Sequence, residues 1–118
     1  MTENKDKLYL EHILEAISSI EVFLKGKTKT DFMADNLLQS AVIRQLTIVG
    51  EATKRIGQEQ KDRSSYTQWR DIAGFRDVLV HDYFGIDLVS VWNTIEIDLP
   101  KLQIEIIKLL DDLNVRNT

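Results

Sequence analysis

The stretch "LLQSAVIRQLTIVGEATKRI", residues 37–56, is the part of the sequence that decides the fold class. Its apolar residues recur at steps of three and four, which places them on one face of an α-helix. This stripe consists of Leu38, Ala41, Val42, Leu46, Val49, Ala52 and Ile56. We therefore predict one long helix that begins near Asp31 or Asp35 and runs to Glu59.

The same periodicity extends on both sides of this stretch. It predicts a first helix over about residues 6–24, with Lys25–Thr30 as a polar connection, and a loop over residues 60–66. A third helix is expected from about Gln68 to the region of Tyr83, with Gly85 as its stop signal.

Two aspartates and a proline mark the boundaries that follow. Asp87 is placed to cap a helix over "LVSVWNTIEI", residues 88–97. Leu99-Pro100 predicts a boundary or kink, because proline disfavours helical geometry in the residue before it. Asp98 would then cap a last helix that has Pro100 in its first turn.

These helices predict an all-α protein, an antiparallel four- to five-helix bundle that forms one domain over residues 1–118. Some apolar residues lie off the main stripes, and they indicate either a homodimer interface or a thick core. These residues are Leu37, Ile43, Ile48, Ile104 and Ile107.

Composition excludes several classes of chemistry. The chain of 118 residues has no cysteine and two histidines, so a disulfide framework is excluded and a zinc site would depend on carboxylates. We expect neither a metal nor a cofactor. The N-terminus lacks an apolar run of signal-peptide length, and no segment is apolar enough to span a membrane. A soluble, cytoplasmic protein is the expectation.

Charge is distributed unevenly along the chain. The formal net charge is −4, but residues 44–76 hold seven basic and four acidic side chains, a net +3. This positive third ends at Arg76. A local basic face can bind a phosphate chain, although a solvated helix surface has the same composition.

The stretch "GFRDVLVHDYFGID", Gly74–Asp87, holds the candidate site residues. On an ideal helix, Arg76 and His81 would be about 140° apart around the axis and about 7.5 Å along it. Asp77 lies four residues before His81, so a carboxylate beside the imidazole would fix its tautomer and raise its pKa. Tyr83 follows two residues later.

This set of side chains suits RNA cleavage without a metal. His81 would move a proton at a ribose 2′-hydroxyl or a leaving 5′-oxygen, and Arg76 would neutralise charge on the phosphate. Tyr83 could bond a phosphate oxygen or stack on a base. From spacing alone, an ordinary helix-end histidine bonded to a carboxylate, with Arg76 in a surface ion pair, explains the same residues.

The stretch "RDVLVHDYF" carries an Arg-x4-His-x-Tyr pattern and resembles the HepT-like toxins of the HEPN superfamily. The segments "AVIRQLTIVGEATKRI", "WRDIAGFRD" and "YFGIDLVSVWNTIEIDLPKL" resemble the same family, so the likeness covers about Leu8 to Leu110. Many HEPN domains carry Asn directly after the motif arginine, where this chain has Asp77. Whether Asp77 orients His81 or weakens RNA binding stays open.

The resemblance implies a HEPN-like bundle that forms a homodimer, with two motifs facing each other across a cleft. It implies a toxin that is a metal-independent endoribonuclease with Arg76 and His81 as catalytic residues and Asp77 and Tyr83 in support. It also implies an MntA-like nucleotidyltransferase antitoxin that transfers AMP to Tyr83. The alternative is a non-catalytic helical module that binds a nucleotide or the nucleotidyltransferase.

Structural roles are predicted for several other residues. Glu51 follows Gly50 and is expected to bond Arg44 or Arg55, with a role in the site as the less favoured reading. Gly50 and Gly74 are expected to allow close helix packing. Among the remaining aromatic and titratable residues, Trp69 and Trp92 are expected in the core and His12 at its edge or on the surface.

Overall fold

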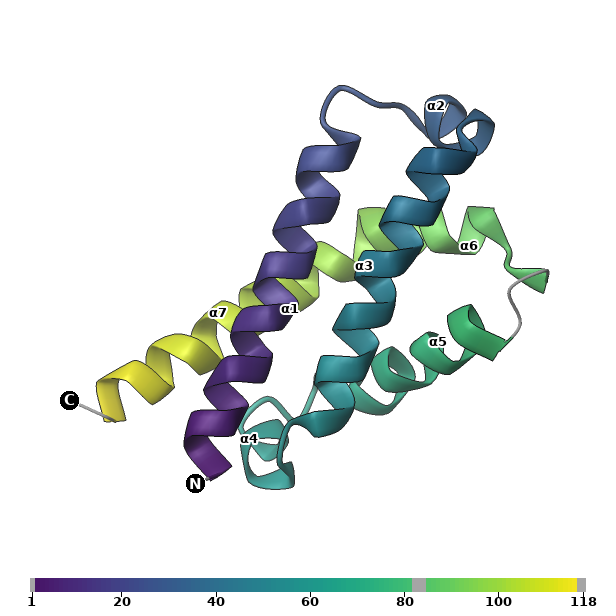
Figure 1. The fold of residues 1–118 in the computed structure, drawn as a ribbon. Helices are drawn as coiled ribbons and strands as arrows, with labels where there is room; N and C mark the ends of the chain where they lie inside the picture. Colours follow the sequence, from purple (N-terminus) through teal and green to yellow (C-terminus); the bar gives the residue numbers. More distant parts are fainter. Residues whose placement is uncertain (1, 82–84, 117–118) are drawn as a thin grey trace.

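The computed structural model describes residues 2–81 and 85–116, and this part of the chain is helical with no β-strand (Figure 1). The all-α prediction is therefore confirmed. In chain order the elements are α1 (Thr2–Leu24), α2 (Lys29–Ala34), α3 (Asn36–Arg55), α4 (Gln58–Asp62), α5 (Trp69–His81), α6 (Leu88–Asn93), the π-helical η2 (Thr94–Asp98) and α7 (Leu99–Arg116).

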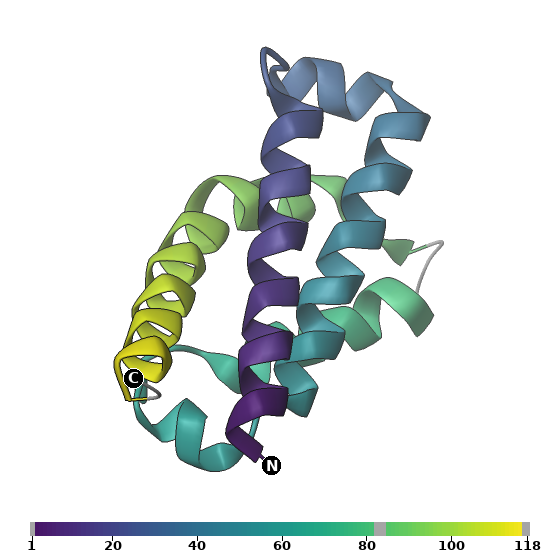
Figure 2. The same ribbon diagram turned by 60° about the vertical axis from the view of Figure 1, so that its left-hand side comes forward.

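The longer helices pack in the order α7, α1, α3, α5. Helices α1 and α3 run antiparallel side by side in both views, and α7 lies against the other side of α1 (Figures 1 and 2). Helix α5 crosses α3 near its C-terminal half (Figure 1). The predicted apolar stripes meet between these helices in one core, which includes Leu10, Ile13, Ile17, Ile20, Val42, Leu46, Val49, Leu102, Ile106, Leu109 and Leu113.

Local side-chain caps set the start of three helices, and Thr28 caps α2 by accepting a hydrogen bond from the Asp31 amide. Asp35 accepts a hydrogen bond from the Leu38 amide at the start of α3, and Asp87 caps α6 as predicted. The short helix α2 was not predicted as a separate element, because Lys29 and Thr30 were assigned to the polar connection and residues 31–34 to the possible start of the long helix. It buries Phe32 against Trp92, with ring centroids 5.5 Å apart, and so closes one end of the core.

The long helix ends earlier than predicted. Helix α3 stops at Arg55, and α4 begins at Gln58 inside the segment that the sequence assigned to helix and loop. Ile56 and Gly57 between them are extended, and Ile56 is buried. The Gly57 amide donates to Oδ1 of the buried Asp6 at 3.0 Å, so a side chain of α1 satisfies the backbone where the helix breaks.

A boundary falls at Leu99-Pro100 as predicted, since η2 ends at Asp98 and α7 begins at Leu99, but the chain stays helical across it. Helix α6 continues through η2 into α7, and Leu99 keeps helical dihedrals with its amide donating to the Thr94 carbonyl. Asp98 lies inside η2 and does not cap α7, so that expectation is wrong. A π turn shifts the hydrogen-bond register by one residue and so accommodates the missing N–H of Pro100, which lies in the first turn of α7 as expected.

Several apolar residues outside the stripes lie on the surface. Leu37 is 81% exposed, Ile104 54% and Ile107 42%, whereas Ile43 and Ile48 pack partly buried against the core. The exposed members of this off-stripe group therefore lie on α7 and at the start of α3. Within residues 2–81 and 85–116, no helix is long and apolar enough to cross a membrane.

Candidate active site

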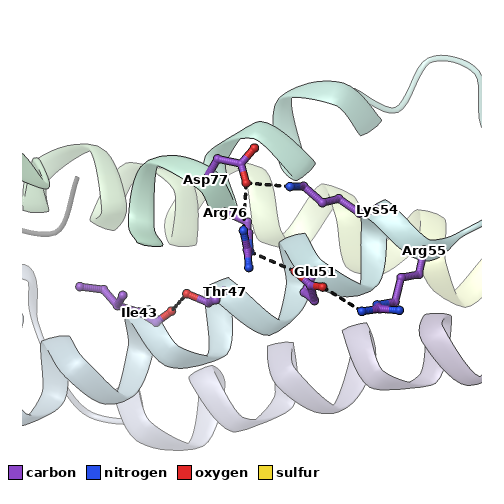
Figure 3. Close-up of polar contacts among 7 residues, drawn as sticks. All are labelled: Ile43, Thr47, Glu51, Lys54, Arg55, Arg76 and Asp77. Atoms are coloured by element: carbon purple, nitrogen blue, oxygen red, sulfur yellow. Dashed lines mark hydrogen bonds and ion pairs between the residues drawn. The ribbon is translucent and has the colours of Figure 1, made fainter. Parts of the chain in front are cut away.

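Arg76 lies on α5 where this helix packs against α3 (Figure 3). The residue opposite it is Gly50. A Cβ atom built on Gly50 would lie 3.2 Å from the Arg76 Cα and 2.2 Å from its Cβ, and real Cβ atoms essentially never come as close as the second distance. Glycine at this position therefore allows the two helices to approach, as predicted. The same expectation is wrong for Gly74, which has nothing within 4 Å of its own Cβ position.

Glu51, the next residue of α3, holds the guanidinium of Arg76. Its Oε2 is 3.0 Å from Arg76 Nε, and its Oε1 accepts a hydrogen bond of 3.2 Å from Arg55 (Figure 3). The buried Nε–H is not aligned for a hydrogen bond, so the contact with Glu51 is an ion pair. The bond to Arg55 was predicted. The contact with Arg76 was not, because it joins two helices and leaves no trace in residue spacing.

Asp77 joins Arg76 to a second cation from α3. Its Oδ1 accepts from Lys54 Nζ at 2.7 Å and from Arg76 Nη1 at 3.1 Å (Figure 3). Hydrogen bonds from Lys54, and then from Arg76, lower the pKa of the Asp77 carboxyl. The Asp77 side chain is 48% exposed, so this charge cluster lies at the protein surface.

The structure describes some of the predicted site residues and not others. Arg76 and Asp77 are brought together, and Lys54 and Glu51 join them as residues that the sequence did not assign to the site. His81 is the last residue of α5, but its side chain and all of Tyr83 lie outside the described residues. The pairing of Asp77 with His81 therefore stays a prediction.

A cavity of about 560 Å³ lies apart from this cluster, between α3, α5, η2 and α7. Its lining includes Leu46, Ile72, Phe75 and Leu102 but none of the four residues of the Arg76 cluster. The cluster is thus not part of this cavity. In the described part of the chain, no group of three or more His, Cys, Asp or Glu residues is arranged to hold a metal ion.

The other aromatic and histidine expectations are confirmed. Trp69 is 8% exposed and donates to the Lys61 and Ser64 carbonyls, and Trp92 packs on Phe32 in the core. His12 is exposed on α1 with its ring edge toward Tyr9.

A model of the family described as ribonuclease HepT-like matches residues 13–109 of the chain, a range that holds the whole Arg76 cluster. Among curated proteins, a "Probable ribonuclease HepT" of Thermococcus cleftensis is 44% identical over 82% of this chain and 88% of its own length. A "Putative RNase" of Caldanaerobacter subterraneus is 38% identical over 86% of this chain and 91% of its own.

A longer relative shares the same region. A "Gamma-glutamylcyclotransferase and putative RNase" of Methanocaldococcus jannaschii is 43% identical over 92% of this chain, which spans only 49% of that protein. No solved structure gives a significant match. The family model matches most of the chain and two relatives align over most of both lengths, so the chain belongs to the ribonuclease HepT-like family.

Proposed function

We propose that the protein is a metal-independent endoribonuclease with Arg76 and His81 as its catalytic residues. The observation that carries this proposal is the placement of Arg76. Its stem is held against Gly50, its Nε pairs with Glu51, and its side chain is still 25% exposed on the helix that ends at His81. A preorganised cation at an open surface is suited to the phosphate of a long polymer substrate.

The proposed reaction begins at a ribose 2′-hydroxyl. A histidine takes its proton, the 2′-oxygen attacks the adjacent phosphorus, and the P–O5′ bond breaks as the 5′-oxygen receives a proton. The products are a 2′,3′-cyclic phosphate and a 5′-hydroxyl. Arg76 would neutralise the charge on the phosphate oxygens in the transition state. In this proposal Asp77 and Tyr83 support the site.

We further propose a homodimer in which two motifs face each other across a cleft. One histidine cannot be base and acid at the same moment, whereas two copies of His81 would supply both. The exposed apolar residues Leu37, Ile104 and Ile107 support an interface with a second copy. Light scattering should give about twice the chain mass of 13.7 kDa, and a monomer would remove the composite site.

The biological proposal is a cytoplasmic toxin that an MntA-like nucleotidyltransferase neutralises by transferring AMP to Tyr83. Each AMP would add bulk and a phosphodiester charge beside the RNA site, which would repel RNA. The other tyrosines are already engaged, since the Tyr66 hydroxyl donates to Glu105 and Tyr9 packs against the core. Tyr83→Phe should escape neutralisation, and AMP mass on a peptide without Tyr83 would refute the assignment.

The catalytic proposal is tested with total RNA in the presence of EDTA. The wild-type protein should cleave, whereas Arg76→Ala and His81→Ala should lose cleavage with unchanged helicity. His12→Ala is the matched control, because His12 is the other histidine and is exposed on α1. Loss of cleavage on chelation, or normal cleavage by His81→Ala, would overturn the assignment. Growth arrest that persists in His81→Ala would favour a non-catalytic partner-binding module.

A further inference from the structure

We infer that Lys54 and Arg76 form a two-cation site for one phosphate oxygen of the RNA, which the Asp77 carboxylate occupies in the free protein. This inference rests on the proposed ribonuclease function and extends it. It adds Lys54 as a substrate-binding residue and makes Asp77 a competitor of the substrate.

The geometry at one oxygen atom carries the inference. Lys54 Nζ and Arg76 Nη1 come from different helices, yet both donate to the same Oδ1 of Asp77, at 2.7 Å and 3.1 Å. Carboxylate and phosphate oxygens accept charge-assisted hydrogen bonds at these same distances. The Asp77 oxygen therefore marks a point at which two cations converge on one anionic oxygen, and it stands in for an oxygen of a phosphodiester.

The site is exposed enough for a phosphate oxygen to replace the Asp77 oxygen. The side chains of Lys54 and Asp77 are 38% and 48% exposed, and ion pairs of such exposure contribute little to stability. The Asp77 carboxylate can therefore move away from Lys54 and Arg76 with little loss of stability. Arg76 would not follow it, because Gly50 and Glu51 hold its stem and its Nε from the side of α3.

Lys54 is distinguished from its neighbour on the helix. Arg55 pairs with Glu51 four residues earlier, along α3 itself. Lys54 instead reaches across to α5. Of the two cations in the last turn of α3, Lys54 donates to the same carboxylate oxygen as Arg76, whereas Arg55 and Arg76 contact different oxygens of Glu51.

The roles predict opposite effects for two substitutions. Lys54→Gln removes one phosphate contact, so RNA binding should weaken roughly fivefold and its logarithmic salt slope should fall by about 0.7. Asp77→Asn removes the competing charge and should tighten binding severalfold. When Asp77→Asn is combined with Lys54→Gln, the gain in RNA affinity should be smaller, because only one of the two cations is then present.

The experiment measures fluorescence anisotropy of a 2′-O-methyl oligoribonucleotide, which cannot be cleaved by 2′-hydroxyl attack, over a salt series. Lys61→Gln is the matched control for Lys54→Gln, because Lys61 belongs to the same positive third but lies on α4. Asp71→Asn is the control for Asp77→Asn, because Asp71 is an exposed acid in the first turn of the same helix. Both controls should stay within about twofold of the wild type.

The outcomes separate this inference from the proposed function. If Lys54→Gln binds like the wild type, or Asp77→Asn binds more weakly, the two-cation site is wrong even if the protein cleaves RNA. Absence of binding by the wild type also overturns it. If the binding effects appear but unmodified RNA is not cleaved, the proposed ribonuclease function fails and the two-cation site stands.

Discussion

The space for a side chain at Gly50 is filled by Arg76. A Cβ at Gly50 would lie 2.2 Å from the Arg76 Cβ and 3.1 Å from its Cγ. The next residue, Glu51, carries the carboxylate that pairs with Arg76 Nε. Two consecutive residues of α3 thus provide the room and the countercharge for one arginine of α5.

Substitution of Gly50 by alanine should force α3 and α5 apart at this point. We expect a loss of about 1–3 kcal/mol in the free energy of unfolding from overpacking, together with a larger loss of RNA cleavage than the stability change explains. Chemical denaturation and a cleavage assay measure the two effects separately.

Gly74→Ala is the matched control on α5. Nothing lies within 4 Å of the Gly74 Cβ position, so alanine should leave stability unchanged or raise it by up to about 1 kcal/mol through its higher helix propensity. Equal stability and activity of the Gly50 and Gly74 variants would show that close approach at Gly50 does not position Arg76.

Glu51→Gln should lower cleavage without unfolding the protein. The substitution keeps the shape of the side chain but removes the charge that pairs with Arg76 Nε and Arg55. Because Glu51 is 39% exposed, we expect less than about 1 kcal/mol of lost stability. The turnover rate should fall about tenfold, which corresponds to about 1.4 kcal/mol of transition-state stabilisation.

Glu59→Gln provides the control for this change. Glu59 is also paired with an arginine four residues later, Arg63, but it lies on α4 and is 84% exposed. Its substitution should leave turnover unchanged. A Glu51 variant that turns over at the wild-type rate would mean that this carboxylate does not position Arg76.

The charge cluster predicts a pH dependence of stability. Lys54 and Arg76 lower the pKa of Asp77 in the folded protein. Its contribution is therefore fully present above the unfolded-state pKa of about 3.9 and is lost as pH falls through the lower, folded value. The difference in Tm between wild type and Asp77→Asn should be constant from about pH 5 to 7 and should shrink below about pH 4. A difference that grows on acidification would contradict this ion pairing.

Interactions within a few residues were predictable from sequence. Asp35 and Asp87 cap helices by accepting hydrogen bonds from backbone amides two or three residues later, and such short spacings are visible in the sequence. The stripes that form the core follow the helical period in the same way. Gly50 was recognised as a packing glycine, but Gly74 looks identical in sequence and does not have this role.

Features that depend on a distant partner were missed. The break at Gly57 is stabilised by Asp6, which precedes it by 51 residues. The pairing of Asp77 with Lys54 spans 23 residues and depends on how α3 and α5 cross. The boundary at Leu99-Pro100 was predicted but the π turn before it was not, because the local rule for proline does not specify how the preceding turn adapts. Residue types and spacing identified Arg76 and His81 as candidates but left their role open, whereas the family resemblance implies a catalytic one.

The chemical ends of the RNA products test the central claim most directly. An unmodified oligoribonucleotide and its fully 2′-O-methylated counterpart are incubated with the wild-type protein in EDTA, and the products are identified by mass spectrometry. Attack by the 2′-hydroxyl predicts 2′,3′-cyclic phosphate and 5′-hydroxyl ends from the unmodified strand and no product from the methylated one. Cleavage of the methylated strand, or products with 5′-phosphate ends, would contradict the roles assigned to Arg76 and His81.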